Sequence, residues 1–104
     1  MFTYNDLVPF CPKIVLAGQM KIKCGSLTTG TTTLTIGSGF FFYTVGGSHS
    51  GLYHLDYWTP EITLIGGGSI GGLGSIVQSA NSKYDFVFTL NDGILLNYVF
   101  IGGV

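Results

Sequence analysis

The chain has 104 residues and a formal net charge of -1, and 9% of its residues are charged. With four lysines and no arginine it has no basic patch to neutralise a phosphate backbone, so a nucleic-acid partner is not expected. Its apolar runs fall well short of the roughly 18 residues that a membrane-spanning helix needs, so no membrane span is expected either.

The surface is expected to be poor in charge, because so few residues are charged, while 46% of the residues are hydrophobic and 17 are glycine. A soluble monomer of this size usually carries a mixed, charged surface. We therefore expect much of this surface to be covered by other copies of the chain or by neighbouring proteins. The two cysteines, Cys11 and Cys24, could in principle close one short loop by a disulfide in an oxidising compartment. We expect reduced thiols, since a free cysteine commonly packs as a small hydrophobic residue.

Residues 1–12 come first in chain order, and we expect an irregular arm because Pro9 and Pro12 disfavour regular structure around them. Glycines then divide residues 13–104 into short segments rich in β-branched and aromatic residues, which is typical of strands. The predicted strands are residues 14–17, 19–24, 31–36, 39–45, 52–57, 61–65, 75–78, 84–90 and 94–101. The sequence predicts a single all-β domain, an antiparallel sandwich or jelly-roll-like fold of eight or nine short strands.

Two of these segments show which side chains share a face of the sheet. In residues 31–36 we expect Thr32, Leu34 and Ile36 to face the core and the other threonines to face water. The run Phe40-Phe41-Phe42-Tyr43 must place aromatic rings on both faces of its sheet. One face can fill the core, and the other can meet a subunit, a partner or a flat ligand such as a sugar ring, so the sequence leaves open which of the three phenylalanines are core and which are interface.

The last two predicted strands are joined by Asn91-Asp92-Gly93, and the Asp-Gly pair predicts a β-hairpin because it tolerates a tight turn with positive φ. The first arm should have one face in water, since its apolar residues alternate with Asp85, Val87 and Thr89. The second arm, residues 94–101, is apolar on both faces, which is typical of a central strand.

Three patterns with catalytic or ligand-binding potential are interpreted as structural. Residues 66–71 match the spacing GxGxxG, but no suitable helix follows to receive a pyrophosphate. His49, His54 and Asp56 are too few to predict a metal site. Asp56 and Glu61 could be a sugar hydrolase's carboxylate pair, which is the weakest alternative. We therefore predict no catalytic residue, no cofactor and no metal.

A surface-recognition site is predicted in the glycine-bounded segment 46–60, where aromatic residues gather. The candidate contact residues are His49, Tyr53, Tyr57 and Trp58. Large exposed aromatic side chains commonly mark contacts with a partner.

Residues 21–27 (Lys-Ile-Lys-Cys-Gly-Ser-Leu), the Thr-rich strand after them, residues 51–57 and residues 98–103 together resemble the distal domains of tailed-bacteriophage fibres. The resemblance covers about residues 20–104. It implies a β domain that forms a homotrimer and touches the host surface. Such domains usually end a long shaft, whereas only a short arm precedes this one, so residues 1–12 are expected to attach it to other virion proteins.

The expected function is that of a non-enzymatic virion structural protein of the fibre-tip or adhesin type, which binds a host-surface glycan or protein. Residues 1–6 lack the basic and apolar pattern of a secretory signal, so we expect synthesis in the host cytoplasm followed by incorporation into the virion. The main alternative is a capsid decoration or cement protein that stabilises the particle without binding a receptor. A carbohydrate-active enzyme is the weaker alternative.

Overall fold

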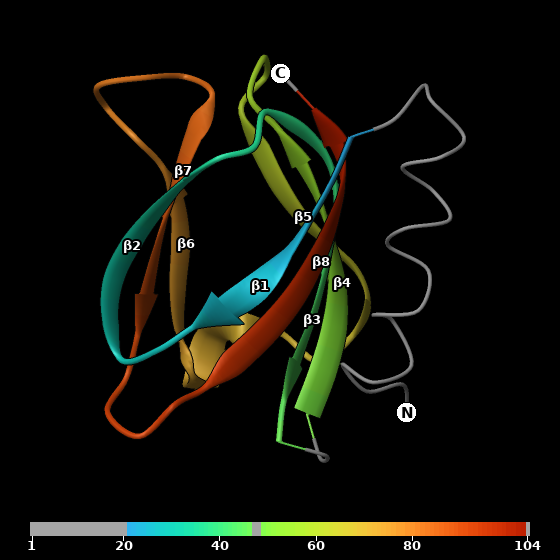
Figure 1. Cartoon of the computed structure of the whole chain (residues 1–104). Helices are drawn as coiled ribbons and strands as arrows, with labels where there is room; N and C mark the ends of the chain where they lie inside the picture. The colour runs from blue at the N-terminus through green and yellow to red at the C-terminus, as the bar shows by residue number, and fades with distance from the viewer. Residues whose placement is uncertain (1–20, 47–48, 104) are drawn as a thin grey trace.

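A computed structural model describes residues 21–46 and 49–103 and folds them into two antiparallel β-sheets that pack face to face (Figure 1). The strands are β1 (Lys21–Leu27), β2 (Gly30–Thr35), β3 (Ser38–Val45), β4 (His49–Asp56), β5 (Glu61–Gly67), β6 (Gly74–Gln78), β7 (Asp85–Leu90) and β8 (Leu96–Gly103). One short 3-10 helix, η1 (Ile70–Gly72), lies between β5 and β6. No helix in the described ranges is long and apolar enough to cross a membrane.

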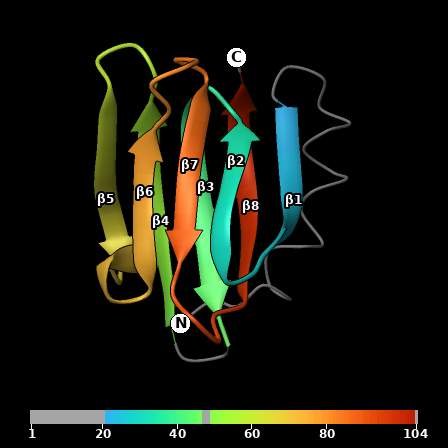
Figure 2. The same cartoon turned by 90° about the vertical axis from the view of Figure 1, so that its left-hand side faces the viewer.

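The larger sheet has the order β1-β8-β3-β4-β5, and the smaller has the order β2-β7-β6 (Figure 2). Strands β3, β4 and β5 follow one another as hairpins, and β8 returns through the other sheet to pair beside β3. The resulting order 8-3-4-5 is that of a Greek key. The prediction of an all-β antiparallel sandwich is therefore confirmed.

Each strand in the described ranges overlaps a strand predicted from the sequence, with ends that differ by up to three residues. The predicted strand 14–17 and the predicted arm 1–12 lie outside the described residues. The alternation predicted for residues 31–36 is confirmed, because Thr31, Thr33 and Thr35 are exposed while Ile36 is buried. The predicted central strand is also confirmed, since β8 lies between β1 and β3.

The hairpin predicted at residues 91–93 is wrong, although Gly93 does have a positive φ of 78°. Strand β7 pairs with β2 and β6, whereas β8 pairs with β1 and β3, so the turn connects the two sheets. The physical reason is that both strands carry a row of large apolar side chains, such as Phe88 and Phe100, which are buried between the sheets. Stacking the strands across the sandwich buries both rows, and other neighbours supply the backbone hydrogen bonds.

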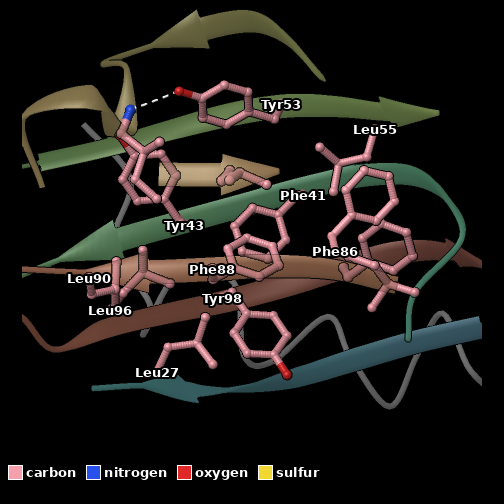
Figure 3. Packing of buried hydrophobic residues seen from close by; sticks show 14 residues of the cluster. Leu27, Phe41, Tyr43, Tyr53, Leu55, Phe86, Phe88, Leu90, Leu96 and Tyr98 are labelled. Atoms are coloured by element: carbon pink, nitrogen blue, oxygen red, sulfur yellow. Dashed lines mark hydrogen bonds between the residues drawn. The ribbon is translucent and has the colours of Figure 1, made fainter. Parts of the chain in front are cut away.

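The core is aromatic at its centre, and Phe41 lies there with an exposed fraction of 0% (Figure 3). Its ring stacks on Phe88 from the opposite sheet at a centroid distance of 4.9 Å and on Tyr98 from the same sheet at 5.4 Å. Phe40 points to the outer face of the larger sheet, where it is 41% exposed and its ring contacts His54. The aromatic run therefore divides between core and outer face, as its alternation requires.

Cys24 lies on β1 opposite Val99 and is disulfide-bonded, which corrects the expectation that its thiol is reduced. Cys11 lies outside the described residues. The strand pattern around Cys24 did not distinguish the two states, because a cysteine packed as a hydrophobic residue and one used in a disulfide look alike in a strand. Disulfides form and persist in oxidising surroundings, such as the exterior of a cell or a virion.

Candidate functional site

The chain turns between β4 and β5, over residues 57–60, and the carboxylate of Asp56 holds this turn. Its Oδ1 accepts a hydrogen bond from the Trp58 backbone N–H at 2.9 Å and another from the Ser38 hydroxyl at 3.1 Å. Its Oδ2 accepts one from the Thr59 hydroxyl at 3.1 Å. These bonds, led by the one from Trp58, lower the pKa of Asp56 below its ordinary value. The backbone that presents the Trp58 side chain is therefore fixed by a charged cap.

This cap predicts a loss of stability in acid. Because the folded state lowers the pKa of Asp56, the unfolded chain binds the proton more readily, and the cap's contribution to stability is present above the ordinary pKa of 3.8. It should be lost as the pH falls further, through the folded-state pKa. Urea unfolding measured between about pH 2 and pH 6 should show a smaller acid loss for Asp56→Asn than for the unchanged protein. The same substitution at Asp92, in the exposed turn 91–93, is the matched control; an equal acid loss in all three proteins would contradict the role of the cap.

Three aromatic side chains and one lysine meet beside this turn, and we call Tyr57, Trp58, Lys83 and Tyr84 the aromatic cluster. Trp58 is 74% exposed. Its ring meets Tyr57 edge to face at a centroid distance of 6.2 Å, and the Tyr57 ring lies 4.7 Å from that of Tyr84. The cluster therefore has a half-buried base and one large ring that projects into water.

The Lys83 ammonium lies over all three rings of the aromatic cluster. The distances from Nζ to the ring centroids are 5.0 Å for Trp58, 5.4 Å for Tyr84 and 5.7 Å for Tyr57. Each lies within the roughly 6 Å over which a cation is attracted to an aromatic face. Within the described ranges, Lys83 forms no ion pair with a carboxylate. The site thus combines a positive charge with an exposed aromatic surface.

Gln78 joins the two chain segments that form the aromatic cluster. Its side-chain amide Nε2 donates one hydrogen bond to the backbone carbonyl of Tyr57 at 2.9 Å and one to that of Lys83 at 2.8 Å. Ser38 adds a further support, because its hydroxyl accepts a hydrogen bond from the Tyr57 backbone N–H at 3.1 Å. The turn 57–60 and the segment 83–84 are therefore held together by the end of β6 and the start of β3.

Two of the four predicted recognition residues, His49 and Tyr53, lie away from the aromatic cluster and support the segment before η1. Tyr53 is only 5% exposed, and its hydroxyl accepts a hydrogen bond from the Ile70 backbone N–H at 2.7 Å and contacts the Ser69 hydroxyl at 3.2 Å. A ring nitrogen of His49, Nε2, lies 3.1 Å from the Ser69 carbonyl oxygen. These contacts anchor a loop, so Tyr53 does not contribute to a surface for recognition.

The glycine-rich segment 66–71 also has a structural role. Its only helical part among the described residues is η1, a 3-10 helix of three residues, and that is too short to provide the helix that a dinucleotide site requires. The Tyr43 hydroxyl donates a hydrogen bond to the Gly68 carbonyl at 2.6 Å. Burial of this hydroxyl raises the pKa of Tyr43 to about 12, with a smaller contribution from nearby Tyr53.

His54, Asp56 and Glu61 are the residues whose metal-binding or acid–base potential the sequence raised, and they lie on the neighbouring strands β4 and β5. No group of three or more metal-ligating side chains occurs in the part of the chain that the structure describes. Asp56 and Glu61 are opposite each other on β4 and β5, and the Asp56 carboxylate accepts hydrogen bonds from the turn 57–60. Its lowered pKa favours the ionised form, so Asp56 is not suited to be the protonated acid of a carboxylate pair.

Sequence reasoning missed three residues of the site. Lys83 and Tyr84 belong to the aromatic cluster, and Gln78 supports it. Tyr84 was predicted to be the first residue of the strand 84–90, but it precedes β7, and its ring packs against Tyr57. No local pattern could have found this pairing, because residues 57 and 84 meet only when the two sheets pack.

Comparisons of the chain with protein-family models, with curated proteins and with solved structures found no match.

Proposed function

We propose that this protein is a non-enzymatic virion structural protein of the fibre-tip or adhesin type and that it binds a host surface through the aromatic cluster. The observation that carries the proposal is the exposed Trp58 ring, 74% accessible, on a backbone fixed by Asp56. A large aromatic side chain left in water on a rigid turn is typical of a contact residue, because little conformational entropy is lost when a ligand covers it.

The location of the aromatic cluster supports this role. It lies where β4 ends and just before β7 begins, so a rigid sandwich carries the loops that form it. Binding residues are commonly placed on such loops. The disulfide at Cys24 suits a protein that functions outside a reducing cytoplasm.

The ligand that best fits the aromatic cluster is a host-surface glycan. A sugar ring can stack its apolar face on Trp58, while its hydroxyl groups stay in water or bond to polar neighbours. A single stacked ring binds weakly, so useful adhesion requires several copies that act together. A homotrimer attached to the virion through residues 1–12 would supply this multivalency.

The test is Trp58→Ala, with binding to host cells and to immobilised glycans measured against the unchanged protein. We expect the variant to lose about thirtyfold or more in affinity, as for a central aromatic contact residue, while its thermal unfolding stays nearly unchanged. Leu95→Ala is the matched control, because Leu95 is a 51% exposed apolar side chain just before β8, at the opposite end of the sandwich. Undiminished binding by Trp58→Ala would overturn the proposal.

A capsid decoration or cement protein is the second candidate, and the edge strand β5 favours it. Every residue of β5 is exposed, including Ile62, Leu64 and Ile65. An exposed apolar edge strand commonly pairs with or packs against another chain. A cement protein would bind to particles rather than to host cells or glycans, and Trp58→Ala would leave its particle binding intact.

A further inference from the structure

We propose that the aromatic cluster is selective for acidic saccharides, with a sugar ring stacked on Trp58 and its carboxylate or phosphate group paired with the Lys83 ammonium. This inference rests on the proposed function, because it names the class of ligand for the same site. The shared chemistry is a pyranose that bears an anionic substituent.

The Lys83 ammonium has capacity to bind a ligand. Within the described residues its Nζ contacts aromatic rings and donates no hydrogen bond to a protein acceptor. Lys23 differs, because its Nζ donates a hydrogen bond to the Thr35 carbonyl. An ammonium has three N–H donors, and an aromatic face satisfies none of them as an oxygen acceptor would. The donors of Lys83 that point away from the rings can therefore bond to an anionic oxygen.

The position of this charge is prepared before a ligand binds. Gln78 holds the backbone of Lys83 to that of Tyr57, and the rings hold the ammonium 5.0 Å from the centre of the exposed Trp58 ring. Lysine otherwise loses considerable side-chain entropy when it is fixed in a contact. The Lys83 side chain is already restrained in the free protein. Binding of an anion therefore loses less side-chain entropy here than at an unrestrained surface lysine.

The charge and the stacking surface also select against other ligands. A cationic ligand would compete with Lys83 for the same ring faces and would be repelled by its charge. A neutral saccharide can stack on Trp58 but leaves the ammonium without an anionic partner. The Lys83 Nζ lies 5.0 Å from the centre of the Trp58 ring, so the positive charge and the exposed indole are neighbours on one surface.

The test measures binding of four probes in matched pairs: trigalacturonic acid with its methyl ester, and phosphomannan with dephosphorylated mannan. The unchanged protein should prefer the charged member of at least one pair by up to about fivefold per site, which corresponds to an exposed ion pair. The preference should shrink at high salt. Which pair shows it distinguishes a carboxylate from a phosphate ligand.

Lys83→Gln should remove the preference for the charged probe, and Lys83→Arg should retain it. Equal binding of charged and neutral probes, or a preference that survives in Lys83→Gln, would overturn the inference and leave the proposed function standing. If Trp58→Ala retains full binding to host cells, the proposed function fails and the inference fails with it.

Discussion

Replacing Phe41 by alanine should lower the free energy of unfolding by about 3 to 5 kcal/mol, the largest effect that we expect from a single truncation in this chain. Phe41 is fully buried, and its ring stacks on Phe88 across the two sheets and on Tyr98 within its own sheet. Alanine would leave a cavity where these three rings meet. A small domain has a total stability of about 5 to 15 kcal/mol, so the variant should be close to unfolding at physiological temperature.

Phe40→Ala is the matched control, because it removes the same side chain from the adjacent position of β3. Phe40 is on the outer face and is partly exposed, so its loss should cost much less, about 1 kcal/mol. Urea unfolding followed by tyrosine and tryptophan fluorescence would measure both variants. Equal destabilisation by the two substitutions would contradict the assignment of Phe41, and not Phe40, to the core.

Replacing Gly51 by alanine should lower the free energy of unfolding by about 3 kcal/mol, at the upper end of the usual cost of overpacking. Gly51 is buried on β4, and a methyl group there would lie 2.3 Å from the Gly68 carbonyl oxygen and 2.7 Å from the Tyr43 ring. Neither neighbour can move easily. The Tyr43 hydroxyl donates a hydrogen bond to that same carbonyl, and the Gly68 backbone N–H donates to Ser50.

Gly66→Ala is the control for this effect, because Gly66 lies on the neighbouring strand β5 and a methyl group there would meet nothing within 4 Å. Its free energy of unfolding should change by less than about 0.5 kcal/mol. Thermal unfolding separates the two variants well, since about 1 kcal/mol shifts the midpoint of a small domain by about 4 to 8 °C. A midpoint for Gly51→Ala as high as that for Gly66→Ala would show that the strand can move to admit the methyl group.

The sequence was enough to predict the strands and which residues of a strand share a face. Both follow from a local period: alternating residues of a strand point to opposite faces, so the threonines of β2 and the phenylalanines of β7 could be assigned from their spacing alone. The same period required Phe40 and Phe41 to face opposite ways. It could not say which of them enters the core, because that depends on which face the second sheet covers.

The pairing of the strands and the location of the site depend on how the two sheets pack. The turn at residues 91–93 fits a hairpin locally, yet it crosses between the sheets because burying both apolar rows is worth more than pairing adjacent strands. The aromatic cluster was half visible in the sequence, as Tyr57 and Trp58. Its other half, Lys83 and Tyr84, comes from a separate segment, and contacts between distant segments depend on sheet packing rather than on any pattern of neighbouring residues.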